Sequence, residues 1–505
     1  MNQRTKVFVL LCCVAQTASV AADESRLLQA GAARIDITER DASPPGRIEA
    51  PLHARALVLK RGETMAVLVT LDVVAIGEIG AIKNDFLPKL RTALRDLPGF
   101  RPEHLIVNAS HCHGIPCKDV LQRTIQVVRE AADELQPVTV GSGMGFEDRI
   151  QENRRLKLKD GREIDVRHAY SMPPDDQVAA VGPIDPEIGI LKLNRTDGST
   201  LAVVYNFACH PIQGAANGAN TADLSGIASQ VIEDNLGSDA VALFVQGCGG
   251  DINPALYKEM NLPRDAEPLG NRLGLSTLKA IRRIECEPTE HLNVTNRTLE
   301  LPRADLAERI DAMQREQDRL VNSLGGTTLN LKSFLPLLMK YRLDEDFPAY
   351  YSHSYLNEEQ QGRRTLQKLD DDNRRALESY IRNIQTMEQL TRVRTNLKLL
   401  QKHQQRAIAA ERKPIRTEVA GLRVGEFRLV TFPGELTVQI GLNLKAASPF
   451  EHTFISGYTN GYIYYSPTAQ QLENVGNAQE DSDCLLAPEW QALFESTALQ
   501  VIEQL

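Results

Sequence analysis

The 505-residue sequence has no long apolar run beyond its N-terminus, no excess of positive charge and no paired Cys-x-x-Cys. A transmembrane helix needs about 20 consecutive apolar residues, so no membrane span is expected after the N-terminal segment. The net charge is −9, which argues against nucleic acid or an anionic membrane as the main partner. Without a Cys-x-x-Cys pair, the sequence offers no zinc-knuckle motif.

Nucleotide-binding loops are also missing. Residues 141–145 read Gly-Ser-Gly-Met-Gly, but the third glycine comes too early for a dinucleotide loop and no helix is expected to follow. Residues 247–250 read Gly-Cys-Gly-Gly without the Lys-Ser/Thr of a phosphate loop, so we expect a tight backbone turn there. A nucleotide cofactor is therefore not expected.

The N-terminus has the pattern of a secretory signal peptide. Arg4 and Lys6 form a basic start, residues 7–15 are a short apolar core, and residues 19–22 read Ser-Val-Ala-Ala, which suits cleavage. The apolar run is too short to persist as a membrane-spanning helix. We expect residues 1–22 to be removed and residues 23–505 to act in the periplasm or as a secreted protein.

Six cysteines remain after residue 22, in a compartment that permits disulfides. Cys112 and Cys117 are candidates to pair across a turn, and Cys209 and Cys248 are candidates if their strands are neighbours. Connectivity does not follow from sequence, so both pairings stay hypotheses.

Strand and helix patterns alternate along most of the chain. Residues 54–59 and 65–72 read as two strands joined in a hairpin, and residues 201–207 and 240–245 read as buried strands. Residues 120–135 carry an amphipathic helical stripe. This alternation predicts an α/β fold in which mixed sheet layers are covered by helices.

The sequence between residues 302 and 412 has a different texture. Arg, Lys, Glu, Gln and Leu dominate it, with long helical periods and no cluster of residues that carries chemistry. We expect a helical insertion within the 23–505 domain that shapes access or association and holds no catalytic group. Its apolar segment, residues 333–339, could also cover an acyl chain.

A His-x-His pair follows the expected buried strand at residues 104–107. Alternate residues near a strand end point to one face, so His111 and His113 should point at one spot. Two imidazoles on one face suit two metal ligands, or a ligand and a proton shuttle. The plainer alternative is a pair of surface or core histidines. Gly114 and Pro116 then turn the chain.

Further polar residues follow other expected strands. His210 comes after residues 201–207, Asp251 after residues 240–245, and Glu435 after a later strand. Ligands of α/β folds gather beyond strand ends, and His, His and Glu form a ligand set of catalytic zinc. Each residue also has a structural explanation. His210 suits a hydrogen-bonded core histidine, Glu435 a carboxylate in the first turn of a helix, and Asp251 an acceptor of nearby amides.

Segments spread along the chain match a known set of motifs in order. They are residues 31–38 for an N-terminal strand, Ser-His-Cys-His-Gly at 110–114 for Thr/Ser-His-Thr-His-Ser, Asn-Arg-Arg at 153–155 for Asn-Arg-Ser, Phe-Ala-Cys-His-Pro at 207–211 for a zinc-histidine motif, Asp-Leu-Ser-Gly-Ile-Ala-Ser at 223–229 for Asp-x-x-Gly-Tyr-Ala-Ser, Pro-Gly-Glu at 433–435, and Asn-Gly-Tyr-Ile-Tyr-Tyr at 460–465 for Asn-x-Tyr-x-x-Tyr. Together they resemble the neutral/alkaline, non-lysosomal ceramidase family, a group of zinc amidases. The similarity covers residues 28–300 and 415–480.

The resemblance implies one zinc ion per chain. Its ligands would be His111, His210, Glu435 and Tyr465, with Tyr462 as the alternative tyrosine. When catalytic, such a site keeps an open position and supplies activated water near neutral pH. The resemblance therefore implies zinc-dependent hydrolysis.

The resemblance also implies catalytic roles for two residues that do not hold the metal. His113 would hydrogen-bond the substrate or shuttle a proton to the leaving amine. Arg154 would hold the amide oxygen or the substrate head group. An N-acyl amide bond would then be cleaved by zinc-activated water.

Some segments depart from the family pattern. The family's Gly-Asp-Val-Ser-Pro-Asn loop is Gly-Asp-Ile-Asn-Pro-Ala at residues 250–255, so Asn253 replaces its serine and a serine nucleophile is not expected. Its Tyr-Glu-Glu-Tyr stretch is replaced by Ala-Gln-Gln-Leu at residues 469–472. Because the chain ends at Leu505, no C-terminal immunoglobulin-like domain is expected. These departures leave the substrate open.

The sequence therefore predicts an exported, zinc-dependent hydrolase of linear amide C–N bonds. Its substrate would be ceramide or a related lipid or small-molecule N-acyl compound, with transient contact at a membrane surface. The first alternative is a zinc hydrolase of another amide or ester, such as an N-acylated sugar or amino acid. The second is a non-catalytic binding protein whose helical insertion docks a partner.

Overall fold

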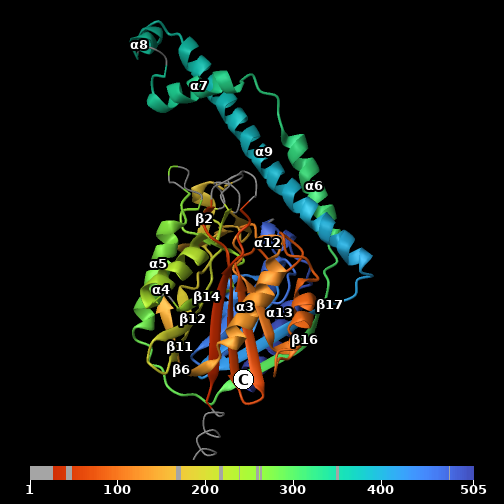
Figure 1. The fold of residues 1–505 in the computed structure, drawn as a ribbon. Coiled ribbons are helices and arrows are strands. Elements are labelled where there is room, and N and C mark those ends of the chain that lie inside the picture. The colour runs from red at the N-terminus through yellow and green to blue at the C-terminus, as the bar shows by residue number, and fades with distance from the viewer. Residues whose placement is uncertain are drawn as a thin grey trace, which may run out of the picture. The chain divides into compact units, whose positions relative to one another are not determined.

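The structure is a computed structural model, drawn in Figure 1. It describes residues 27–40, 48–166, 172–214, 220–237, 239–257, 261, 264–348, 352–476 and 478–505. The expected signal peptide lies outside these residues. In the described part of the chain, no helix has both the length and the apolar character that crossing a membrane requires.

The chain divides into two compact units. The first contains Met1–Asp165, Ala179–Ala304 and Ala407–Leu505, and the second contains Val166–Val178 and Asp305–Arg406. All of the predicted site residues belong to the first unit.

Two large sheets form the framework of the first unit. The eight-stranded sheet has the order β14 (Val241–Gln246), β12 (Thr200–Phe207), β11 (Glu187–Arg195), β6 (Gln136–Phe146), β1 (Gln29–Asp36), β3 (His53–Arg61), β4 (Thr64–Leu71), β5 (Leu105–Ala109). The four-stranded sheet has the order β16 (Leu292–Leu301), β17 (Ile415–Val424), β18 (Phe427–Thr431), β20 (Thr453–Ser456). Both sheets mix parallel and antiparallel pairs.

Short strands complete the sheet structure. The two-stranded pairs are β2 (Ile48–Ala50) with β13 (Asn220–Thr221), β7 (Gln151–Asn153) with β15 (Ile252–Pro254), and β19 (Glu435–Leu436) with β21 (Tyr465–Ser466). A three-stranded sheet has the order β10 (Val178–Val181), β8 (Arg155–Leu158), β9 (Glu163–Asp165). Glu435 and Tyr465 lie on β19 and β21, and Arg154 follows β7.

An apolar core lies between the two large sheets. Successive strand residues point to opposite faces. On β3, Leu57 and Leu59 therefore join the core between the sheets, while Val58 points to the helical side. Phe427 and Leu429 of β18 meet Leu57 and Leu59 in the same core. The two sheets thus share one buried layer.

Helices cover the outer faces of both sheets. α3 contacts β1 and β3, α4 contacts β14, and α5 contacts β6 and β11, whereas α10 and α13 contact the four-stranded sheet. Figure 1 shows α4 and α5 side by side. The helices of this unit are α2 (Phe86–Ala93), α3 (Val120–Asp133), α4 (Asp223–Leu236), α5 (Glu267–Ile281), α10 (Val438–Ala447), α11 (Ala469–Leu472), α12 (Gln479–Ser482) and α13 (Trp490–Gln504).

Twist brings distant strand ends of the large sheet together. The order of parallel and antiparallel steps makes β4 and β5 run opposite to β12 and β14 along the sheet. The backbone N–H of Gln246, at the end of β14, nevertheless donates to Asn108 Oδ1 of β5 at 3.0 Å. A twist of about 20–25° per strand pair adds up to roughly half a turn across such a sheet. The C-terminal ends of β5 and β14 can therefore meet.

The second unit contains the helical segment between β16 and β17. Its helices are α6 (Ala307–Ser323), α7 (Leu331–Leu343), α8 (Ser352–Gln360) and the long α9 (Thr365–Ala409), which continues past Arg406. Phe334 and Tyr341 of α7 pack with Leu377 of α9 in a small core of their own. Leu335 and Met339, on another side of α7, are exposed.

The mixed α/β fold covered by helices agrees with the sequence prediction, whereas two local predictions are wrong. The six cysteines after residue 22 are free thiols, so neither proposed disulfide forms, although β12 and β14 are neighbours. Glu435 lies in strand β19, three residues before α10 begins at Val438, and not in the first turn of a helix.

The register of β16 and β17 predicts that the helical segment can be removed. Leu301 and Ile415 are paired across these antiparallel strands, and Arg303 Nε donates to the Lys413 carbonyl at 2.8 Å. We expect a linker of about four residues, a usual hairpin length, to replace residues 305–411 without unfolding the first unit. Circular dichroism melting and metal analysis check this.

The same deletion should change substrate preference or the oligomer size measured by size-exclusion chromatography. Metal loss from a folded deletion protein would show that the helical segment contributes to the predicted zinc site.

Candidate metal centre

Three buried side chains from separate strand ends converge in the first unit. His111 follows β5, His210 follows β12, and Glu435 begins β19. Their potential ligand atoms all lie within 4.8 Å of one another. Glu435 Oε2 is 3.1 Å from His210 Nε2 and 3.6 Å from His111 Nε2. The structure thus brings together the two histidines and the glutamate that the sequence singled out.

Backbone carbonyls fix the orientation of both imidazoles. His111 Nδ1 is 2.6 Å from the Val74 carbonyl oxygen, and His210 Nδ1 is 3.0 Å from the Ile252 carbonyl oxygen. A carbonyl oxygen only accepts hydrogen bonds, so each Nδ1 must carry the proton that it donates. In the neutral ring, Nε2 then presents a lone pair. This arrangement is the usual support for a metal-binding histidine.

The three inner atoms would repel one another without a cation. With neutral rings, two Nε2 lone pairs face the negative Glu435 carboxylate in a buried space. A divalent metal bound by all three groups removes the conflict, and nitrogen and oxygen donors of this kind suit zinc. The residues present therefore fit the metal that the resemblance implies.

Two tyrosine hydroxyls hold the Glu435 carboxylate in place. Tyr458 donates to Oε2 at 3.2 Å, and Tyr462 donates to Oε1. Burial raises the pKa of both tyrosines well above its ordinary value, and the Glu435 charge raises it further. Both hydroxyls therefore stay protonated and donate to the carboxylate.

Tyr465, the tyrosine predicted as a metal ligand, is the cross-strand partner of Glu435. The two residues are paired between β19 and β21, and Tyr465 is buried. Its hydroxyl accepts a hydrogen bond from Arg154 Nη2 at 3.2 Å. Its role as a ligand stays a prediction, as does the alternative role of Tyr462.

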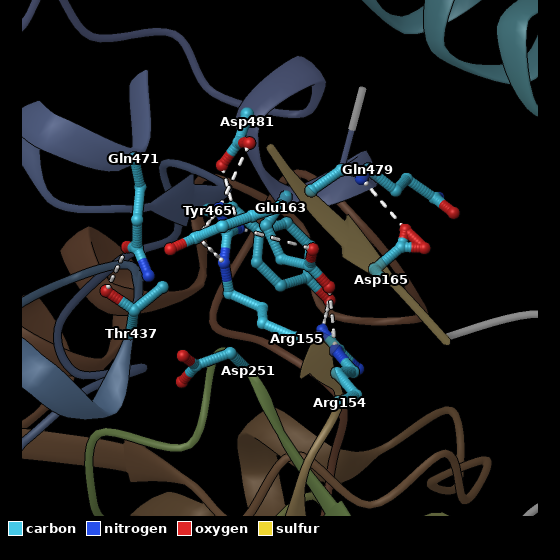
Figure 2. A network of polar contacts seen from close by, with 12 residues as sticks. Arg154, Arg155, Glu163, Asp165, Asp251, Thr437, Tyr465, Gln471, Gln479 and Asp481 are labelled. Carbon is cyan, nitrogen blue, oxygen red and sulfur yellow. Dashed lines mark hydrogen bonds and ion pairs between the residues drawn. The ribbon is translucent and has the colours of Figure 1, made fainter. Parts of the chain in front are cut away.

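Arg154 is buried in the polar network drawn in Figure 2. Its Nε lies 2.7 Å from Glu480 Oε1, and its Nη2 donates to the Gly250 carbonyl as well as to Tyr465. Burial lowers the pKa of Arg154, but Tyr465, Glu480 and Glu435 raise it more, so the pKa lies above its ordinary value. The guanidinium therefore brings a permanent positive charge next to Tyr465.

His113 lies beside His111 of the candidate metal site but is exposed to solvent. Its ring centroid is 5.5 Å from that of His111. The expected strand geometry is wrong here, because β5 ends at Ala109 and His111 has a φ of 67°. The two rings are close because of this left-handed turn, a conformation that is uncommon for a non-glycine residue.

The loop after β14 makes a close backbone contact with the Glu435 segment. A Cβ atom on Gly250 would lie 2.6 Å from the Glu435 carbonyl oxygen, so only glycine fits without a shift. Asp251 accepts hydrogen bonds from the Val438 backbone N–H at 2.8 Å and from Asn153 Nδ2 at 3.1 Å. Asp251 thus accepts hydrogen bonds from nearby amides, which is the structural role that the sequence analysis gave as the alternative to a chemical one.

Sequence reasoning missed Tyr458. The residue is fully buried, has a φ of 54°, and its ring centroid is 4.4 Å from that of His111. It stands two residues before the tyrosine motif at residues 460–465 and has no motif of its own. A buried aromatic residue usually indicates core packing, so its type alone gave no functional signal.

A cavity of about 590 Å³ elsewhere in the first unit does not contain the predicted site residues. It is lined by β2 and the segment after it, by α4, and by the start of α5. Its size therefore does not identify the chemical site, which follows instead from the converging ligand atoms.

Comparisons with known proteins find solved structures with a similar fold. No protein-family model and no curated protein sequence matches the chain. The crystal structure of neutral ceramidase from Pseudomonas aeruginosa matches with 17% identity and a TM-score of 0.59, covering 95% of this chain and 75% of that chain. A ceramidase complexed with C2 matches with 16% identity and a TM-score of 0.59, covering 94% and 75%. The chain therefore has a neutral ceramidase-like fold.

Proposed function

We propose that this protein is a zinc-dependent amide hydrolase that cleaves an N-acyl bond of ceramide or a related compound. The observation that carries the proposal is the buried convergence of His111, His210 and Glu435 with both imidazole Nδ1 atoms already engaged. The ceramidase-like fold supports the amide as the bond that is cleaved. The same donor set would also serve an amidase for other N-acyl compounds.

His111, His210 and Glu435 would hold the ion. Bound zinc would supply Lewis acidity and activated water near neutral pH. Tyr458 and Tyr462 orient the Glu435 carboxylate through their hydrogen bonds. Burial of these three side chains would keep bulk water away from a bound ion and strengthen the electrostatic interactions there.

Two further residues are proposed to act on the substrate. His113 has the exposure needed to exchange a proton with the leaving amine and lies next to His111. Arg154, charged and hydrogen-bonded to Tyr465, favours negative charge developing on a substrate oxygen nearby.

The basic and short apolar start of the sequence supports export.

The first test is metal content. We expect the purified protein to hold close to one zinc ion per chain, and His210→Ala to lose most of it because a buried ligand is removed. His291→Ala changes an exposed histidine and should keep the ion. Mass-spectrometric metal analysis decides, and full zinc retention by His210→Ala contradicts the ligand assignment.

The second test concerns catalysis by His113. His113→Ala should keep its zinc and its melting temperature but lose about 10²–10⁴-fold in kcat, the usual contribution of a proton-transfer group. The assay is hydrolysis of a panel of N-acyl lipids, N-acyl amino acids and N-acetyl sugars. A kcat close to that of the unmodified protein would remove His113 from the mechanism.

The third test concerns Arg154. Arg154→Ala would remove the cation nearest to the buried Glu480 carboxylate and leave it only the longer 3.7 Å contact with Arg155 Nη1, which would destabilise the fold. Arg154→Lys keeps the charge but cannot make all the contacts of the guanidinium fork. It should retain zinc and lose about 10²–10³-fold in kcat, whereas the exposed Arg162→Lys should change neither. Unchanged turnover in Arg154→Lys argues against the proposed role.

A further inference from the structure

Asn253 carries a buried hydrogen-bond donor that no described residue satisfies. The side chain is 1% exposed, and its Nδ2 has no hydrogen-bond partner among the residues that the structure describes. A buried donor left unpaired costs about 1–3 kcal/mol. Such a group in a folded protein requires an explanation, and a bound ligand is one.

The direction of this donor is fixed by Arg154. Arg154 Nη1 donates to Asn253 Oδ1 at 3.2 Å. Guanidinium nitrogens cannot accept, so the amide oxygen must face Arg154 and the amide nitrogen must face the other way. The contact therefore orients the Asn253 donor and leaves it available.

Asn253 adjoins the proposed zinc site along the backbone and through side chains. The preceding residue, Ile252, accepts hydrogen bonds from both the backbone N–H and the Nδ1 of His210. Arg154 also donates to Tyr465, the cross-strand partner of Glu435. Asn253 is thus linked to His210 through Ile252, and to Glu435 through Arg154 and Tyr465.

We propose that Asn253 Nδ2 donates a hydrogen bond to the scissile carbonyl oxygen of the substrate and stabilises the negative charge that develops there. The inference rests on the proposed amide hydrolysis and adds a catalytic residue to it. A neutral amide held in place before the reaction is an effective donor of this kind. In this role Asn253 acts as a hydrogen-bond donor and does not attack the substrate as a nucleophile.

A purely structural role for Asn253 makes a different prediction. In that case its oxygen supports Arg154, and its amide nitrogen has no function. Asn253→Asp retains an oxygen for Arg154 and removes the donor, whereas Asn253→Ala removes both. The aspartate variant therefore separates support of Arg154 from contact with the substrate.

The decisive measurement is steady-state hydrolysis of the best substrate from the N-acyl panel. We expect Asn253→Asp and Asn253→Ala both to keep zinc and to lose about 10²–10³-fold in kcat, with KM changed much less. A tetrahedral phosphonate analogue of that substrate should lose affinity for both variants by a similar factor. Asn293→Asp adds the same charge at an exposed position and should change neither property.

Each outcome decides the inference. If Asn253→Asp keeps near-normal kcat while Asn253→Ala loses it, the residue only supports Arg154 and the inference is wrong. If both variants keep near-normal kcat, the inference is again wrong, while the proposed hydrolase stands. If the unmodified zinc-loaded protein hydrolyses no member of the panel, the proposed function and the inference fail together.

Discussion

The buried meeting of two imidazole lone pairs with a carboxylate is the constraint on which the site depends. The Nδ1–H groups of His111 and His210 donate to the Val74 and Ile252 carbonyls, so in the neutral rings the Nε2 atoms face Glu435 as acceptors. A hydrogen-bonded core histidine would instead direct a proton at the carboxylate. The carbonyl partners of the two Nδ1 atoms therefore distinguish a metal-binding histidine from a core histidine. They favour a metal ion between the three side chains.

The fold meets this constraint by tying the ligand-bearing segments together through their backbones. The Gly250 N–H donates to the Leu436 carbonyl, the Tyr458 N–H donates to the Gly434 carbonyl, and the Ala109 N–H donates to the Tyr458 carbonyl. These segments are far apart in the sequence but join the ends of both large sheets. Because the contacts are backbone to backbone, they depend on the path of the chain, and at Gly250 a side chain would not fit without a shift.

Periodic patterns predicted the mixed α/β fold because burial in a layered sheet imposes a period of two and a covering helix a period near 3.6. Motif order selected His111, His210 and Glu435, which do converge. The left-handed turn at His111 was not predictable, since its conformation depends on contacts made by distant segments. Tyr458 was missed for a related reason: its function comes from the partner that its hydroxyl meets, not from its residue type.

The ligand set around Glu435 has a consequence for metal selectivity. Tyr458 occupies one lone pair on Oε2 and Tyr462 one on Oε1, which leaves one lone pair on each oxygen for a metal. Calcium and magnesium prefer oxygen shells of six or more ligands, whereas two imidazoles favour a smaller shell with nitrogen. A metal held by these residues would therefore be one that accepts nitrogen donors, rather than calcium or magnesium.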